Sequence, residues 1–519
     1  MARLVEAHGK SLLASAGIPI PKGRLAASPD EAAEIAEEIG GDCVLKAQIL
    51  MTGRAGKGLI RFAPDPGAAW REAEDLLGRV VGTHTVKQVL VEERVTAAAE
   101  YFAAIFVDDR SRAPRILFSS RGGAGIEEIA REHPEAVADL LVDVFTGLRA
   151  YEARDLVRRT GVKGKNLPPL GEFLVKLYRA FRAVEARTLE VNPILETEQG
   201  RFLAADCHAT IDDYAVFRHP ELGIAMAREL DHEPTALEAA AYRVEQRDYR
   251  GTFYFFQMEQ GFKKGEGVVG FHGAGGGGSM MSMDALQKFG LRPANFCDTS
   301  GNPPASKVYR AAKVILQQKE IDGYFASGSG VASQEQFHSA RGMIKAFREL
   351  NLSVPAVIRL GGNAEEIAMD LLRKHGKDLR APIEAYGKDD SAVFCAERLK
   401  DLVEKMKERE GSPAAEAVRP VGNMNPPKTP YRFETITGSL TIDHDVCRVC
   451  ENQVCVPACP VEILSLNDAK LPVLNITLDE AKKGRCVECL ACELTCWDES
   501  KNAIRIDLPI PGLDGGERS

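Results

Sequence analysis

Residues 447–460 are CRVCENQVCVPACP, and residues 486–497 are CVECLACELTCW. The two segments contain eight of the chain's twelve cysteines. Each places three cysteines close together and a fourth after three intervening residues, just before Pro460 or Trp497. A CxxC turn lets two thiolates bind one metal centre, and a nearby third cysteine adds another ligand. This spacing therefore predicts two metal centres between residues 447 and 496.

Two kinds of metal centre could use these cysteines. A closed zinc site takes four ligands, commonly as two pairs, and could explain the CxxC pairs. It does not explain two triplets that are each followed by a fourth cysteine. In proteins with two iron–sulfur clusters, that fourth cysteine binds the other cluster. We therefore favour two [4Fe–4S] clusters, with zinc or purely structural cysteines as the alternatives.

Residues 435–519 resemble bacterial-type ferredoxin domains, which are small α+β domains that transfer electrons. They differ in the four residues before the third cysteine and in Trp497, where proline is common. The resemblance implies crossed ligation, in which each set gives one cysteine to the other cluster. One cluster would be bound by Cys447, Cys450, Cys455 and Cys496, and the other by Cys459, Cys486, Cys489 and Cys492.

Length and composition limit the possible function classes. With 519 residues, of which 45% are hydrophobic and 27% charged, the chain is long enough for several globular domains. The net charge of −9 leaves no basic surplus for nucleic acid. No apolar run approaches the roughly 18–20 residues of a membrane span, and the N-terminus lacks a signal-peptide core. Together with cysteines devoted to clusters, these features predict a cytoplasmic protein without nucleic-acid or membrane partners.

The N-terminal part contains a candidate phosphate site. Apolar spacing predicts helices at 3–16 and 29–39 and a strand at 43–49. That strand contains Lys46, and the glycine-rich segment TGRAGKG follows at 52–58. Glycine lets the backbone approach phosphate oxygens, and lysine or arginine neutralises their charge. A glycine-rich hairpin with surface lysines is the alternative for this segment alone.

Two later strand ends add candidate metal ligands. Asn192 and Asp206 offer the hard oxygen atoms that Mg²⁺ prefers. With these segments in this order, residues 4–400 resemble the β subunit of succinyl-CoA synthetase and related ADP-forming acyl-CoA synthetases. The resemblance implies an ATP-grasp domain at 1–240 that binds Mg²⁺ through Asn192 and Asp206 and ATP or GTP through Lys46, Gly53, Arg54, Ala55, Glu92 and Glu100. Of these, Lys46, Arg54 and Glu100 would be catalytic.

Some positions differ from this family. Ala55 replaces a usual glycine, and the acidic loop of the family appears as RGGAGIE at 121–127, which lacks two of its three acids. Asp206 is followed by Cys207 and His208 instead of glycine and lysine. These differences concern the phosphohistidine step or the substrate more than nucleotide binding.

A second α/β domain is expected at residues 255–405. A buried strand at 267–271 precedes HGAGGGGS (272–279), and a glycine-rich turn before a helix is a typical anion site, although it can also be a flexible loop. Further strand-end loops indicate a doubly wound parallel sheet. The resemblance implies a flavodoxin-like domain with the substrate-binding residues His272, Gly328, Ser329, Gly330 and Val331. A proline-rich linker at 406–434 would connect it to the ferredoxin domain.

Two functions from different classes fit these features. We favour a β-type subunit of an ADP-forming acyl-CoA synthetase, an acid–thiol ligase acting on a carboxylic acid, with a fused electron-transfer domain. It would need an α-type partner that binds CoA and carries the phosphohistidine, because no segment resembles that half of the family's machinery. The alternative is an iron–sulfur electron-transfer subunit of a larger oxidoreductase complex. There a redox partner would dock, and the ATP-grasp part would bind nucleotide or serve as a scaffold.

Overall fold

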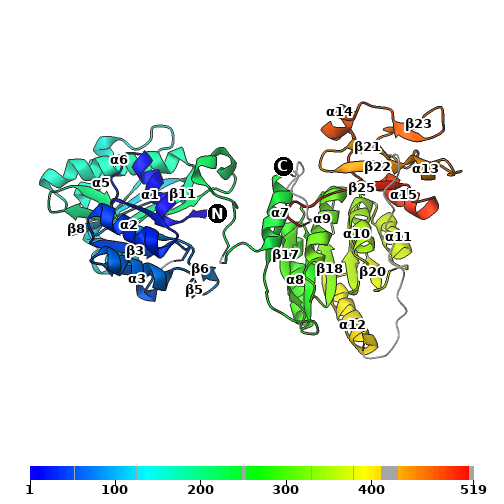
Figure 1. The fold of residues 1–519 in the computed structure, drawn as a ribbon, viewed down its shortest axis with the longest axis horizontal. Coiled ribbons are helices and arrows are strands. Elements are labelled where there is room, and N and C mark those ends of the chain that lie inside the picture. Colours follow the sequence, from blue (N-terminus) through cyan, green and yellow to red (C-terminus); the bar gives the residue numbers. More distant parts are fainter. Residues whose placement is uncertain are drawn as a thin grey trace. The chain divides into compact units, whose positions relative to one another are not determined.

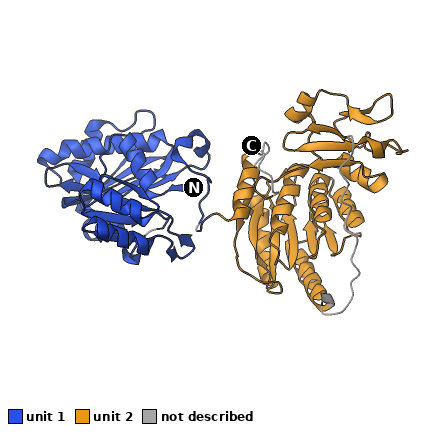
Figure 2. Cartoon of the chain, in the orientation of Figure 1, with its two compact units in different colours: residues 1–233 blue, residues 234–519 orange. Residues whose placement is uncertain are grey.

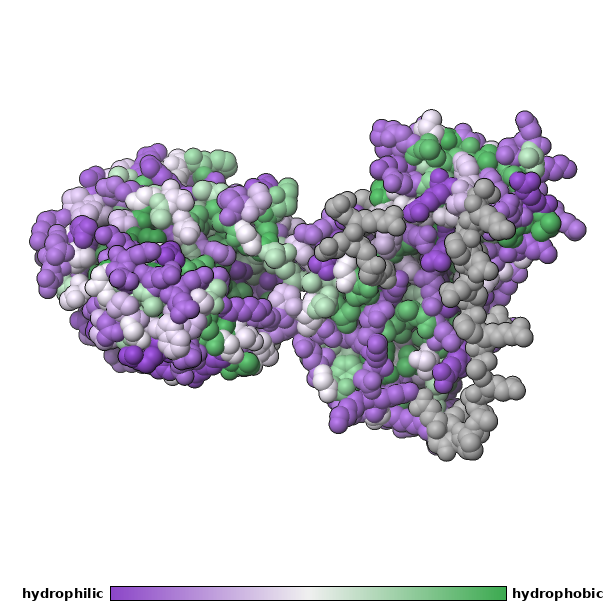
Figure 3. Space-filling view, viewed as in Figure 1, coloured by the Kyte–Doolittle hydropathy of each residue, from purple (hydrophilic) through white to green (hydrophobic). Residues whose placement is uncertain are grey.

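The structure, a computed structural model, describes residues 1–51, 53–123, 125–230, 232–247, 253–328, 330–377, 379–410 and 430–513. The chain forms two compact units, 1–233 and 234–519 (Figure 2). Hydrophilic side chains cover most of the visible surface of each unit, and smaller apolar areas lie among them (Figure 3). No helix in the described ranges is long and apolar enough to cross a membrane.

Unit 1 has the α/β fold that the sequence predicts, built on two antiparallel sheets (Figure 1). The larger sheet contains, in order, β1 (Ala2–Leu4), β13 (His208–Ile211), β11 (Ala186–Thr197), β8 (Ala97–Asp108), β9 (Ala113–Ser119) and β10 (Val137–Leu141), with β12 (Phe202–Ala204) paired to β11. Helices α5 (Ala150–Arg159) and α6 (Leu167–Ala183) pack against it. Helix α6 buries Leu170, Leu174, Leu177 and Phe181, whose helical spacing gives it one apolar face.

The smaller sheet has the order β2 (Gly23–Ala26), β7 (Val89–Glu93), β3 (Cys43–Ala47) and β4 (Ile60–Ala63). Helices α2 (Pro29–Ile39) and α3 (Pro66–Leu76) pack on it. Ser28 and Asp65 cap the first turns of these helices, and α2 ends at Gly40 in the left-handed conformation. These local signals explain why α2 has the bounds predicted from the sequence.

The first helix is shorter than predicted. Residues 2–4 form β1 at the edge of the larger sheet, so α1 spans only Glu6–Ser15. The remaining elements of unit 1 are η1 (Ala55–Lys57), β5 (Val80–Val81), β6 (His84–Thr85), α4 (Ile126–Glu132), η2 (Pro134–Ala136), η3 (Gly164–Asn166), η4 (Val216–Arg218) and η5 (Pro220–Leu222).

Unit 2 is organised around a mainly parallel sheet. Its order is β14 (Tyr254–Gln257), β17 (Asn295–Asp298), β15 (Val268–Ala274), β18 (Gly323–Gly328), β19 (Ala356–Arg359) and β20 (Ile383–Tyr386), with β14 antiparallel and β16 (Arg292–Pro293) paired to β15. Helices α7 (Ala236–Gln246), α9 (Ala305–Leu316), α10 (Phe337–Glu349) and α11 (Glu365–Gly376) contribute to the core on one face. Helices α8 (Gly276–Lys288) and α12 (Ala392–Glu410) contribute to the core on the other.

The cysteine segments lie in the C-terminal part of unit 2. A three-stranded antiparallel sheet has the order β21 (Pro430–Glu434), β22 (Ser439–Asp443) and β25 (Ile504–Asp507). The other elements are α13 (His444–Cys447), β23 (Leu464–Leu466), β24 (Pro472–Leu474), α14 (Leu478–Glu480), η6 (Ala481–Arg485) and α15 (Ala491–Glu499).

This C-terminal part shares one hydrophobic core with the parallel sheet. One hydrophobic core contains buried residues from positions 240 to 385 and also buried residues from positions 433 to 510. Helix α10 pairs with α15 through Lys345 Nζ, 2.6 Å from Glu493 Oε1. We expected a separate domain beyond a linker at 406–434; residues 411–429 of that linker lie outside the described ranges.

Candidate functional site

Unit 1 contains a buried network of charged side chains between α1 and the two sheets. Lys46 Nζ on β3 lies 2.7 Å from Glu6 Oε1 and 3.2 Å from Glu92 Oε2. It also donates to the carbonyl oxygen of Ala205 at 2.6 Å. Arg54 lies 2.7 Å from Glu6 and 3.2 Å from Asp206. The structure thus brings Lys46, Arg54 and Asp206 together across more than 150 residues of sequence.

Neighbouring opposite charges keep Lys46 and Asp206 ionised. Burial would lower the pKa of Lys46, but the carboxylates of Glu6, Glu92 and Asp206 outweigh that effect and raise it. Burial would likewise raise the pKa of Asp206, but a hydrogen bond from His208 and the charge of Arg54 hold it well below its ordinary value. Lys46 and Arg54 are therefore cations that a phosphate could engage by displacing carboxylates.

Sequence reasoning missed two members of the network, Glu6 and Lys10. Both lie one helical turn apart on α1, and Lys10 Nζ is 2.9 Å from Glu6 and 2.6 Å from Glu92. Their helical spacing was the available signal, because two charges on the inner face of an amphipathic helix need buried partners. Glu92, which we expected near the base and ribose, is only 2% exposed and is engaged by two lysines.

Of the two expected Mg²⁺ ligands, Asn192 lies within β11 at the irregularity between Val191 and Ile194, and Asp206 lies just beyond the end of β12. The register of β11 and β12 pairs Ile194 with Ala204, and the amide of Ala205 donates to the carbonyl of Pro193. Asn192 directly precedes Pro193 in the chain, and Asp206 directly follows Ala205. Within the described ranges, no three His, Cys, Asp or Glu side chains converge closely enough to hold one metal ion. Two protein oxygens nevertheless suit Mg²⁺, which usually keeps several waters and binds substrate phosphates.

The altered loop at 121–127 folds against this same region. The amide of Gly123 donates to Asn192 Oδ1 at 2.9 Å, and a Cβ on Gly123 would lie 2.2 Å from Glu100 Oε2. Gly123 therefore lies next to both Glu100 and Asn192. Glu190 on β11 is a further nearby acid that sequence reasoning did not single out, and burial raises its pKa. The glycine-rich loop positions Gly53 and Ala55 are exposed beside the buried Arg54.

In unit 2, the predicted loops meet at the carboxyl edge of the parallel sheet. Asp298 Oδ1 accepts hydrogen bonds from the amides of Gly275 and Ser300, which joins two of these loops. Arg359 donates to the carbonyl of Gly328 at 2.8 Å and so supports a third. The glycine run forms the end of β15 and the first turn of α8.

The five predicted substrate-binding residues have different surroundings. His272 is 2% exposed and bonded to the hydroxyl of Tyr324, and burial lowers its pKa to about 3. It is thus a neutral core residue that does not face an open surface. Gly328 and Gly330 lie at the carboxyl edge, and Val331 is 80% exposed there. Ser329 lies outside the described ranges.

The structure gathers the eight C-terminal cysteines into two groups. Burial raises the pKa of Cys447 to about 12, with further contributions from its neighbours Cys455, Cys496 and Cys450. Burial also raises the pKa of Cys492, and there the neighbouring thiols are those of Cys489, Cys486 and Cys459. Cys459 thus lies near Cys492, and Cys496 lies near Cys447, while crossed ligation itself stays a prediction.

All four cysteines of the second group line one small pocket, together with apolar residues that include Leu440, Ile463 and Ile506. Backbone N–H groups of Glu488 and Ala491 donate to the sulfurs of Cys486 and Cys489. In the first group, the amide of Ala503 donates to Cys496 Sγ at 3.2 Å. In the described ranges, the thiols of neither group converge closely enough to hold a metal ion, so the two clusters stay a prediction.

Comparison with known proteins places the N-terminal part in a family. The model of the ATP-grasp domain matches residues 3–196, and that of the ATP citrate lyase citrate-binding domain matches residues 263–397. The chain is 38% identical to the β subunit of GDP-forming succinate–CoA ligase from Thermus thermophilus, over 71% of this chain and 93% of the relative. The chain belongs to the succinate–CoA ligase β-subunit family.

A second relative and a solved structure resemble a similar part of the chain. An ADP-forming succinate–CoA ligase β subunit from Archaeoglobus fulgidus is 35% identical over 73% of this chain and 95% of the relative. The ATP citrate lyase of Methanothrix soehngenii, solved with citrate and coenzyme A, has a similar fold, with a TM-score of 0.64 at 20% identity over 77% of this chain and 99% of that one. In the present chain, the two regions that match family models, residues 3–196 and 263–397, both end before the cysteine segments begin.

Proposed function

We propose that the chain is the β-type subunit of a nucleotide-dependent acid–thiol ligase that activates a carboxylic acid, and that it binds two [4Fe–4S] clusters. The observation that supports ligase chemistry best is the convergence of Lys46, Arg54 and Asp206 in one buried network. Family membership supports it independently. The competing proposal, an electron-transfer subunit with a passive ATP-grasp scaffold, leaves this network of buried charges without a purpose.

In this proposal, nucleotide binding begins with an exchange of partners. A triphosphate would take Lys46 and Arg54 from Glu6 and Asp206, which releases the Asp206 carboxylate for the metal. Asn192 and Asp206 would hold Mg²⁺, which neutralises phosphate charge when it is bound. Glu100 and Asn192 both lie next to Gly123, and an acid at this place can orient the metal's water ligands.

The carboxylic acid would bind at the carboxyl edge of the parallel sheet in unit 2. The order of its parallel strands supports a flavodoxin-like assignment, in which ligands bind at this edge. Backbone amides of the first turn of α8 and the loop held by Arg359 offer donors for carboxylate oxygens. The match to a citrate-binding domain and the succinate–CoA ligase relatives both favour a di- or tricarboxylate.

An α-type partner would provide CoA binding and the phosphohistidine. Large apolar side chains are exposed near the carboxyl edge, with Met280, Met281 and Val331 between 66% and 80% exposed. They are candidates for the partner's contact surface. His272 cannot replace the missing histidine, because it is buried and hydrogen-bonded to Tyr324.

The ligase proposal is tested with the purified full chain, Mg²⁺, ATP or GTP, CoA and a panel of succinate, citrate and acetate. We expect acyl-CoA only when an α-type subunit is added. Acyl-CoA formation by the single chain, together with acid-labile phosphate on it, would refute the two-subunit proposal and make His272 the first residue to mutate. A complex that makes no acyl-CoA with any acid would refute the ligase proposal itself.

The cluster proposal rests on the doubled cysteine spacing, the two spatial groups and the thiol-lined cavity. Protein purified without oxygen should contain about eight iron and eight acid-labile sulfide per chain. Bound zinc without sulfide would overturn it.

A further inference from the structure

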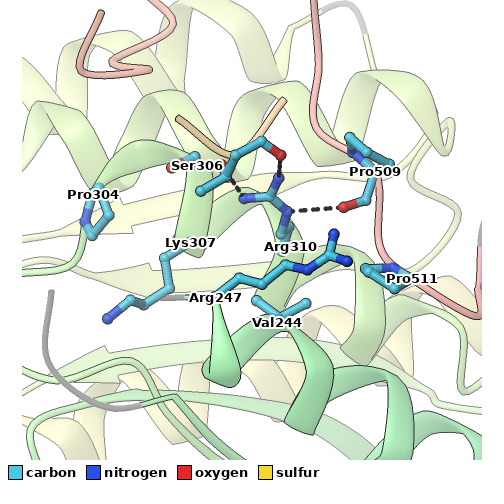
Figure 4. A pocket seen from close by; sticks show the side chains of 9 residues that line it. Val244, Arg247, Pro304, Ser306, Lys307, Arg310, Pro509 and Pro511 are labelled. Carbon is cyan, nitrogen blue, oxygen red and sulfur yellow. Dashed lines mark hydrogen bonds between the residues drawn. The ribbon is translucent and has the colours of Figure 1, made fainter. Parts of the chain in front are cut away.

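A small pocket of unit 2 lies where helices α7 and α9 meet the C-terminal part of the chain (Figure 4). Arg247, at the end of α7, lines one side of it, and Lys307 and Arg310 of α9 line another. Thr437 and Pro509 come from the C-terminal part, beyond both regions that match family models. The pocket therefore belongs to neither of the two matched domains alone.

The walls of this pocket are basic. Among its described lining residues, Arg247, Lys307 and Arg310 are cations and none is acidic. Lys307 and Arg310 are buried, at 3% and 5% exposure, whereas Arg247 is exposed. A concave site whose walls carry charge of one sign concentrates ions of the opposite sign. The charge of the pocket thus favours an anionic ligand.

Oxygen atoms of the C-terminal part hold Arg310 in place. Its Nε donates to the carbonyl oxygen of Pro509 at 3.2 Å. Its Nη1 and Nη2 donate to the hydroxyl and carbonyl oxygens of Thr437 at 2.9 and 2.8 Å, and Figure 4 draws these bonds as dashed lines. The guanidinium plane is therefore fixed at the pocket wall before any ligand binds, so less side-chain entropy is lost on binding.

The start of α9 adds donors of a second kind. Pro304 is the N-cap residue of this twelve-residue helix, and Ser306, in the first turn, is buried and lines the pocket. The N–H groups at a helix N-terminus attract anions and bind phosphate oxygens. Guanidinium groups bind the same oxygens in pairs. Charge, hydroxyl and helix N-terminus together suit a phosphate group.

We propose that this pocket binds the phosphate group of a small phosphorylated organic molecule. Arg247 and Arg310 would hold the phosphate, and Lys307 would add positive charge from the wall. Val244 and Pro511, which also line the pocket, would contact the carbon skeleton of the ligand. The inference depends neither on ligase chemistry in unit 1 nor on metal bound by the cysteines. A ligand at this place would contact the ligase fold and the cysteine-containing part at once.

The test uses phenyl phosphate as the probe and isothermal titration calorimetry of the full chain. Arg247→Gln removes a pocket charge from an exposed side chain, and Arg247→Lys keeps that charge. Arg373→Gln on α11 is the matched control, because Arg373 is 56% exposed and pairs with Asp370 on its own helix. Lys46→Ala reports whether the probe binds in unit 1 instead. The unfolding temperature of each sample separates lost binding from lost structure.

We expect Arg247→Gln to weaken phenyl phosphate binding about tenfold, because it removes one charge-assisted contact. Arg247→Lys should weaken it less, and Arg373→Gln and Lys46→Ala should bind the probe as the parent protein does. Inorganic phosphate should bind more weakly than phenyl phosphate, because it leaves the apolar side of the pocket unused. Benzoate should also bind more weakly, because a carboxylate carries less negative charge than a phosphate.

A parent protein that binds no phenyl phosphate would overturn the inference, and so would equal affinities in Arg247→Gln and Arg373→Gln. Loss of binding in Lys46→Ala but not in Arg247→Gln would overturn it as well, since the probe would then bind in unit 1. If benzoate or inorganic phosphate binds as tightly as phenyl phosphate, the proposed ligand class is wrong.

Discussion

Replacing Lys10 by methionine should destabilise unit 1 strongly. The Lys10 side chain is 2% exposed, and its Nζ lies 2.6 Å from Glu92 and 2.9 Å from Glu6. Methionine keeps the apolar stem but removes the charge, so two buried carboxylates retain only Lys46 and Arg54 as counter-charges. Removing one partner of a buried ion pair costs about 3–5 kcal/mol, because the remaining charge cannot recover its hydration.

For a unit of this size, that cost corresponds to a fall in unfolding temperature of about 6–20 °C. Differential scanning calorimetry of the full chain measures it, with the transition of unit 2 as an internal reference. Lys87→Met is the matched control: Lys87 is 70% exposed and lies 2.7 Å from Glu233, a surface pair worth about 1 kcal/mol or less. If the two variants unfold at the same temperature, the reasoning about the buried network is wrong.

Three further outcomes follow from the candidate sites. Lys46→Ala should weaken Mg²⁺–nucleotide binding about ten- to a hundredfold, because it removes a charge-assisted contact of ~1.5–3 kcal/mol; unchanged affinity in isothermal titration calorimetry would make the ATP-grasp resemblance purely structural. Gly123→Ala should slow turnover, because its φ is +83° and the added Cβ would lie 2.2 Å from Glu100, whereas Gly161→Ala, in open space at φ +88°, should not. Cys489→Ser should empty mainly one cluster and Cys450→Ser the other, as iron analysis and resonance spectra would report; simultaneous loss of both clusters from each variant would contradict two separate centres.

Local signals in the sequence predicted some parts of the structure well. Ser28, Pro29 and Gly40 mark the two ends of α2, and these bounds agree with the structure because capping acts within a few residues. The strand ends that contain Asp298 and Gly328 were found because glycine and polar residues interrupt apolar strands.

Other features depended on partners distant in sequence and could not be predicted in this way. Glu6 and Lys10 belong to the buried charge network only because α1 brings them to Lys46 on β3 and Glu92 on β7, about 40 and 80 residues further along. His272 follows an anion-site pattern, but it alternates into the core on β15 and meets Tyr324 there.

The continuous core of unit 2 has a practical and evolutionary consequence. Phe433, Leu440 and Ile506 pack in the same core as residues of α9 and α10, so the ligase part and the cysteine part cannot be expressed apart without exposing apolar surface. A shortened chain that ends near residue 410 would also leave Lys345 and Arg348 without Glu493 and Asp498. We expect such a truncated protein to aggregate. Gene fission at this junction would therefore be selected against, even in a lineage that no longer used the cysteine segments.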